Sequence, residues 1–132
     1  MQPIDAAIPA YLRKGQGRKR HPQACYEKAA HYISCHFGDE SVRLVHGRVV
    51  PNGDWKIRYA HAWVEIGDAI VFDGVEQHFY DREDYYREME PVVEAMYAPH
   101  EAAGLISETR HSGRWRKPTL GTPEPVDESA NS

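Results

Sequence analysis

The sequence predicts an α+β domain: an N-terminal helix that carries a cysteine packs on a small antiparallel β-sheet, with helices at the C-terminal end. Three observations support this fold class. Apolar or small residues recur with helical spacing over residues 23–37, side chains alternate over residues 55–73, and an acidic helical pattern starts at residue 81. With 132 residues the chain fits one domain that buries an adequate core.

The predicted N-terminal helix covers residues 23–37 and places Cys25 in its first turn. The buried face is predicted from the spacing i, i+4, i+7, i+8, i+11, i+12, and comprises Cys25, Ala29, Tyr32, Ile33, His36 and Phe37. A thiol at a helix N-terminus has a lowered pKa, because the partial positive charge there favours the thiolate. Cys25 is therefore a candidate nucleophile, although a single buried cysteine is more often an apolar core residue.

Three strands are predicted next, over residues 41–50, 55–66 and 69–73, with turns at residues 51–54 and at Gly67-Asp68. Because side chains alternate along a strand, His61 and Asp73 share a face only if the second turn has an odd number of residues. With three residues in that loop, we expect Asp73 directly opposite His61, accepting its Nδ1 proton. With an even loop, Glu76 or Asn52 would become the alternative.

The C-terminal third is predicted to be helical. Asp81 or Asp84 is a candidate N-cap, Pro91 ends or kinks the first helix, residues 91–97 continue the helical pattern, and Pro99 begins a short helix through residue 106. By composition, residues 1–22 are expected to form a basic, partly ordered arm, residues 23–110 the folded domain, and residues 111–132 a disordered tail.

Charge and composition bear on which binding partners and which cellular compartment are expected. The net charge of −4 predicts no overall attraction to nucleic acid or to an anionic membrane, and no apolar run has the ~18 residues of a membrane span. A local basic cluster lies in the arm, at Arg13, Lys14, Arg18, Lys19 and Arg20. Cys25 and Cys35 lie ten residues apart on one helix, too far to bond to each other, so we expect a reducing, cytoplasmic location.

Cys25, His61 and Asp73 are the three residue types of a nucleophilic acyl-transfer site. A thiolate attacks the acyl carbon, an imidazole moves the proton, and a carboxylate orients the imidazole. The oxyanion would be held by the Cys25 backbone N–H and a side-chain donor, with Gln23 the nearest candidate and Gln16 the next.

A tryptophan and three metal-ligating side chains are further candidates for binding roles. Trp63 shares the face of His61 and is a candidate for shaping the substrate site, although a core role is more usual for such a tryptophan. His31, Cys35 and His36 are metal-ligating types, but two or three ligands of mixed facing do not make a tetrahedral site, so no metal or cofactor is expected.

The motif Cys-Tyr-x-x-Ala at residues 25–29, followed by His-Ala-Trp-Val-Glu at 61–65 and Val-Phe-Asp at 71–73, resembles the papain-like and transglutaminase-like cysteine enzyme superfamily. It is most similar to the compact bacterial and phage members, over about residues 23–75. The resemblance implies a papain-like catalytic domain in which Cys25 is the nucleophile, His61 the general base and acid, and Asp73 the orienting residue. It also implies a hydrolase or acyltransferase for peptide or protein amides or thioesters, and leaves hydrolysis, deamidation and transamidation open.

The alternative is a non-catalytic binding module of the same fold, whose basic arm binds nucleic acid or an acidic partner. Salt separates the two interpretations, since binding through the arm must weaken steeply as the salt concentration rises.

Overall fold

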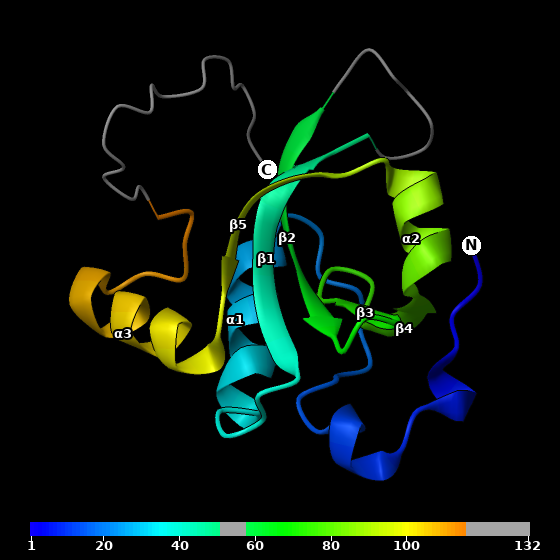
Figure 1. The fold of residues 1–132 in the computed structure, drawn as a ribbon, viewed down its shortest axis with the longest axis horizontal. Helices are drawn as coiled ribbons and strands as arrows, with labels where there is room; N and C mark the ends of the chain where they lie inside the picture. Colours follow the sequence, from blue (N-terminus) through cyan, green and yellow to red (C-terminus); the bar gives the residue numbers. More distant parts are fainter. Residues whose placement is uncertain (51–57, 116–132) are drawn as a thin grey trace.

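The computed structural model describes residues 1–50 and 58–115, which form one antiparallel β-sheet with helices on both faces (Figure 1). The strands are β1 (Val42–Val49), β2 (Tyr59–Ile66), β3 (Ile70–Asp73), β4 (His78–Asp81) and β5 (Val92–Tyr97). The helices are α1 (Cys25–Cys35), α2 (Arg82–Met89) and α3 (Pro99–Thr109), preceded by two 3₁₀ turns at Asp5–Ala7 and Ala10–Arg13. The sheet has five strands in the order β4-β3-β2-β1-β5, which confirms the α+β class.

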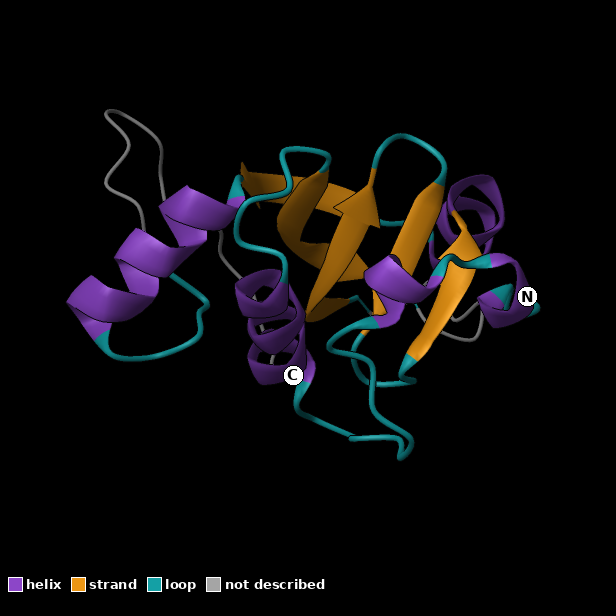
Figure 2. Ribbon diagram, turned by 90° about the horizontal axis from the view of Figure 1, so that it is seen from below, coloured by secondary structure: helices purple, strands orange, loops and turns teal. Residues whose placement is uncertain are grey.

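Helices lie on both faces of the sheet (Figure 2), and the buried apolar residues form two hydrophobic cores. The larger core lies between the sheet and helices α1 and α3, and contains Tyr32, Ile33, Leu44, Val64, Phe72 and Phe79 among others. The smaller core lies under α2 and is built on Trp63, with Val45, Val49, Val71, Tyr80 and Tyr85. Successive residues of β2 therefore point into different cores, as the alternating pattern predicts.

Helix α1 begins at Cys25, two residues later than predicted, and ends at Cys35. Gln23 has a φ of 66°, in the left-handed region, so the helix cannot start before it. At the other end, Phe37 lies outside the helix and is 55% exposed, so the predicted buried face is wrong at this residue. Cys25 nevertheless stands at the first helical position, with its side chain buried.

The β2–β3 hairpin has a three-residue loop, because Ile66 pairs with Ile70. The loop is odd, so the parity argument holds. The expected register is wrong, however: the ladder pairs Val64 with Phe72, and one further step places Asp73 opposite Trp63, with His61 two residues beyond. Asp73 thus reaches His61 diagonally on the same face, a distance that longer side chains bridge.

Residues 92–97 form strand β5, not the predicted helix. Pro91 lacks an N–H and stops α2, and the β-branched pair Val92-Val93 joins the edge of β1. The β1–β5 register shifts between His46 and Gly47, where a Cβ on Gly47 would collide with the Val92 carbonyl oxygen. Strand β4 was not predicted, because its four residues carry no long periodic pattern.

The starts of the second and third helices agree with the prediction, whereas the third helix ends three residues later than predicted. The Asp81 side chain caps α2 by accepting a hydrogen bond from the Asp84 N–H at 3.1 Å. Pro99 stands at the first position of α3, which extends to Thr109. None of the helices within residues 1–50 and 58–115 is long and apolar enough to cross a membrane.

Residues 1–22 pack on the domain. The Ile4 N–H donates to the Phe79 carbonyl oxygen at 2.8 Å, the His21 N–H donates to Val75 at 2.8 Å, and Leu12 is buried. Ile8 and Leu12 of this segment belong to the larger core, and Ile4 packs against it. At the other end, Trp115 is only 7% exposed and belongs to the same core, so the packed structure extends past residue 111.

The predicted turn at residues 51–54 and the first residues of the predicted strand 55–66 lie outside the described residues, as does the predicted tail from residue 116 onward.

Candidate active site

The structure brings Cys25, His61 and Asp73 together at one end of the sheet. His61 lies in the first half of β2, and the ladder with β3 covers Val64 to Ile66. Beyond the end of β3, the imidazole is reached from one face by the start of α1 and from the other by α2. The site therefore lies where the two cores meet.

His61 is hydrogen-bonded on both sides. Its Nε2 lies 3.3 Å from Asp73 Oδ2 and 3.1 Å from the Tyr85 hydroxyl oxygen. The same imidazole is hydrogen-bonded to Cys25. Because Nε2 faces Asp73 and Tyr85, we assign the Cys25 contact to Nδ1. The expected Nδ1 contact with Asp73 is therefore wrong, since the diagonal register turns Nε2 toward the carboxylate.

The Asp73 carboxylate is held from several directions and is 3% exposed. Oδ1 accepts the backbone N–H groups of Val75 and Glu76 at 2.9 and 3.1 Å, and Oδ2 accepts the Tyr85 hydroxyl at 2.6 Å. The next residue, Gly74, packs against α1, where a Cβ would stand 2.6 Å from Lys28 Cβ. A glycine at this position lets the loop that fixes Asp73 approach the helix that carries Cys25.

The electrostatics of the site favour a charged imidazole. Burial disfavours the imidazolium, but hydrogen bonds and charge interactions with Asp73 and Cys25 outweigh it and raise the pKa of His61 to about 10. For Asp73, burial favours the neutral acid, but hydrogen bonds from His61 and Tyr85 and the His61 charge lower its pKa to about 2. The two side chains thus form a buried ion pair at neutral pH.

Tyr85 is the site residue that sequence reasoning missed. It is fully buried, and its hydroxyl lies between Asp73 and His61. Tyr85 lies within the helical pattern that starts at residue 81, but the sequence carried no signal that this tyrosine, 12 residues from Asp73, would reach its carboxylate.

The two predicted oxyanion donors have different surroundings. Gln16 is not available, because both of its amide hydrogens are used: Nε2 donates to Asp5 Oδ2 at 2.8 Å and to the Gln77 carbonyl oxygen at 2.9 Å. Gln23 is exposed and lies two residues before Cys25, so it stays the candidate. Cys25 is the first residue of α1, so its N–H stands at the helix start, where the sequence predicted the backbone donor.

Trp63 cannot line an open substrate site, because it is fully buried. Its ring stacks on His61 with centroids 5.9 Å apart, and its Nε1 donates to Glu65 Oε2 at 3.1 Å. Trp63 supports the imidazole from behind.

The three metal-ligating side chains of α1 do not converge. His31 Nε2 lies 3.8 Å from Cys35 Sγ, whereas His36 Nε2 lies 2.7 Å from the Lys14 carbonyl oxygen. No group of three or more His, Cys, Asp or Glu side chains suited to a metal ion occurs in the part of the chain that the structure describes.

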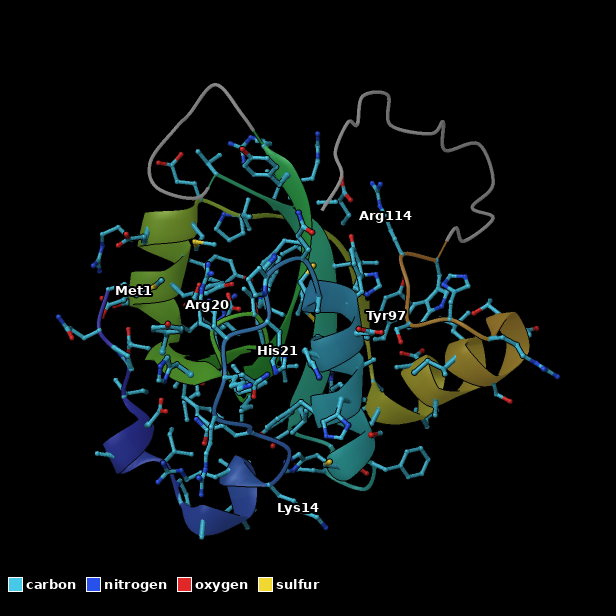
Figure 3. All side chains as sticks on the ribbon, turned by 180° about the vertical axis from the view of Figure 1, so that it is seen from behind. Met1, Lys14, Arg20, His21, Tyr97 and Arg114 are labelled. Carbon is cyan, nitrogen blue, oxygen red and sulfur yellow. The ribbon has the colours of Figure 1, made fainter. Side chains whose placement is uncertain are left out.

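Two segments flank the N-terminal end of α1. Figure 3 shows Arg20 and His21 on one side of this helix and Arg114 and Tyr97 on the other. Arg20 pairs with Glu76 at 3.0 Å and Arg114 with Glu94 at 3.4 Å. Of the basic cluster in the arm, Arg20 is thus paired with a carboxylate.

Comparison of this chain with protein-family models, with curated proteins and with solved structures gave no match. The functional interpretation therefore rests on the fold and on the geometry of the site.

Proposed function

We propose that this protein is a cysteine-dependent hydrolase or acyltransferase with a papain-like or transglutaminase-like core, acting on amide or thioester bonds of peptides or proteins. The observation that carries the proposal is the continuous hydrogen-bonded chain from Cys25 through His61 to Asp73, with the thiol at the first position of α1. The resemblance of residues 23–75 to that superfamily assigns the same three residues the same roles.

In the proposed mechanism, His61 Nδ1 already holds the proton that the Cys25 thiol has given up, and the Cys25 thiolate attacks the acyl carbon. The new S–C bond moves the carbonyl electron pair onto oxygen, where the Cys25 N–H stabilises it. The intermediate collapses, the C–N or C–S bond breaks, and His61 returns its proton to the leaving group. His61 then takes a proton from water or an amine, which attacks the thioester and frees Cys25.

Asp73 orients the imidazole and stabilises its charged form whenever His61 holds the extra proton. Since its carboxylate has a pKa of about 2, it does not take the proton from His61. Its role is to stabilise the imidazolium that forms when the thiol ionises.

Neither cysteine forms a disulfide, which fits action in a reducing compartment such as the cytoplasm. Cys25 is 2% exposed, so a small acyl or alkyl probe is the right first reagent.

The proposal is tested by weighing the intact protein after incubation with iodoacetamide and a panel of small acyl electrophiles. We expect wild type to gain one adduct on Cys25 at a pH well below 8.5, the approximate pKa of an ordinary thiol. Cys25→Ser should gain none, and Cys35 serves as the internal control because it lies at the opposite end of the same helix.

Equal labelling of Cys25 and Cys35 at neutral pH would contradict an activated nucleophile. If the protein also bound an acidic polymer in a salt-sensitive manner that requires Arg18, Lys19 and Arg20, the binding-module interpretation would replace the enzyme. Labelling of Cys25 alone, with no salt-sensitive binding, supports the proposal.

A further inference from the structure

The hydroxyl of Tyr85 makes the shortest contact that the structure records among His61, Asp73 and Tyr85. It lies 2.6 Å from Asp73 Oδ2 and 3.1 Å from His61 Nε2, whereas Nε2 and Oδ2 are 3.3 Å apart. The imidazole is therefore closer to the hydroxyl than to the carboxylate that was expected to orient it. The side chain of Tyr85 is fully buried, so water does not compete for these bonds.

Counting protons assigns the direction of each bond. An ionised carboxylate only accepts, so the single hydroxyl proton of Tyr85 goes to Asp73 Oδ2. The hydroxyl oxygen then has only lone pairs left for His61, and Nε2 must carry a proton to bond to it. A proton fixed on Nε2 leaves Nδ1 as the nitrogen that exchanges a proton with Cys25.

The environment keeps this arrangement intact over the working pH range. Burial and the neighbouring Asp73 charge raise the pKa of Tyr85 well above its ordinary value, so the hydroxyl stays a donor. The backbone donors of Val75 and Glu76 are bound to Oδ1, so the position of Oδ2 depends on its bonds to Tyr85 and His61.

We propose that Tyr85 is a positioning residue of this site: its hydroxyl holds Asp73 Oδ2 and His61 Nε2–H together and so directs Nδ1 at the Cys25 thiol. The inference rests on the proposed function and adds a fourth member to the site. Tyr85 does not touch the reacting atoms and acts only through His61.

Helix α2 offers a matched control at the next residue. Tyr86 also donates its hydroxyl to a carboxylate, that of Glu65, which pairs with Arg82 at 3.0 Å. This second network fastens α2 to the sheet but has no recorded bond to His61 or Asp73. Tyr85→Phe and Tyr86→Phe therefore remove the same atom from the same helix, and only the first removes a bond to the site.

The test is the rate of Cys25 alkylation by iodoacetamide as a function of pH, in wild type and both variants. Loss of one neutral hydrogen-bonding group should lower the neutral-pH rate of Tyr85→Phe about fivefold. The midpoint of the profile should move to higher pH, because the misaligned imidazole stabilises the thiolate less. Tyr86→Phe should keep the wild-type midpoint, even if its melting temperature falls.

A double-mutant cycle then separates positioning from packing. In an Asp73→Asn background the hydroxyl has lost its carboxylate partner, so the effect of Tyr85→Phe should shrink to less than about twofold. The same fold-change in both backgrounds would overturn the proposal, as would equal midpoints for Tyr85→Phe and wild type.

A measurement on wild type keeps the inference testable if Tyr85→Phe fails to fold. Nitrogen-15 correlation spectra of the histidine side chains report which ring nitrogen carries hydrogen. A proton on His61 Nε2 with a slowly exchanging Tyr85 hydroxyl proton beside it supports the proposal, and a neutral ring protonated on Nδ1 alone overturns it. If this arrangement is found but Cys25 labels no faster than Cys35, the proposed function fails while the Tyr85 assignment stands.

Discussion

Two buried histidines on neighbouring strands show how differently one sheet can treat the same side chain. His46 on β1 pairs with Ala62 on β2, and His61 pairs with Gly47, one position further along the ladder. Because Ala62 and His61 are successive residues, the two imidazoles point to opposite faces of the sheet. Their surroundings drive their pKa values in opposite directions.

His46 is surrounded by rings and is 3% exposed. Tyr26 meets it edge-on with ring centroids 4.8 Å apart, and Trp115 stacks on it at 5.1 Å. Its Nε2 is buried and has no hydrogen-bond partner among the described residues. Burial, with a smaller effect of the Arg114 charge, lowers the pKa of His46 to about 3, so it is neutral wherever the fold is stable.

The comparison teaches that burial sets a common penalty and the partners decide the outcome. Both rings lose water, which disfavours the imidazolium. Only His61 has a carboxylate and a thiol within hydrogen-bonding reach, and its pKa is raised to about 10. A buried histidine therefore points to chemistry when its partners are acidic, and to packing when they are aromatic.

The largest expected effect is on the rate of Cys25 labelling when each of the two histidines is substituted in turn. His61→Ala removes the proton acceptor, so formation of the Cys25 adduct by an acyl electrophile should slow by about 10²- to 10⁴-fold. His46→Leu should slow it less than about threefold, since the pKa of His46 is set by burial and by Arg114 and not by Cys25, His61 or Asp73. Mass spectrometry of the intact protein at fixed times measures both rates; comparable losses would mean that the comparison is mistaken.

The next effect concerns the charge state of the two rings. In wild type, neither His46 nor His61 should titrate between about pH 5 and pH 8, one because it stays neutral and the other because it stays charged. Asp73→Asn removes the negative partner, so the pKa of His61 should fall by roughly two to three units. His46 should not change, because Asp73 is absent from its surroundings. Proton NMR of the ring Hε1 signals follows both, and a His61 that titrates normally in wild type would refute the ion pair.

A smaller effect is expected on stability in acid, and it belongs to His46. Its folded pKa of about 3 lies below the unfolded value of about 6.5, so on acidification the unfolded chain takes up the proton first. Stability is fully present above pH 6.5 and is lost as the pH falls toward 3. From pH 6.5 to pH 5 the loss should be about 1.5 kcal/mol.

Urea unfolding of wild type and His46→Leu at pH 6.5 and pH 5 isolates this contribution. The difference between the two proteins should shrink by the same amount on acidification. Asp73 does not interfere, because its pKa is lowered to about 2 and its contribution is lost only below about pH 4. Parallel losses in both proteins would assign the acid sensitivity to another group.

The smallest expected effect comes from the cap of the helix that carries Tyr85. Asp81→Ala removes the side chain that accepts the Asp84 N–H, which should cost about 1 kcal/mol of unfolding free energy. The loosened start of α2 should shift the NMR signals of His61 and leave those of His46 in place. Signals of His46 that moved as far as those of His61 would show that the two faces are coupled.

The sequence alone determined the features that depend on local chemistry. Helical spacing placed Cys25 in the first turn of a helix, turn residues at Gly67-Asp68 joined two strands, and Asp81 was one of two candidate caps. Strand parity put His61 and Asp73 on one face on the condition of an odd loop, which the structure has. Each of these depends on neighbours within a few residues, and such preferences are written in the order of the amino acids.

Only the tertiary structure decided the rest, because contacts between distant segments outweigh local preference. Residues 92–97 have helical spacing but become β5, since the edge of β1 offers hydrogen bonds that Pro91 denies to a helix. The three-residue loop lies at residues 67–69, and the register that this position sets places Asp73 diagonally to His61, with Nε2 toward the carboxylate. Tyr85 reaches that carboxylate, and Trp115 reaches His46, because packing of α2 and of the chain after α3 brings them there, and no periodic pattern encodes which rings will meet.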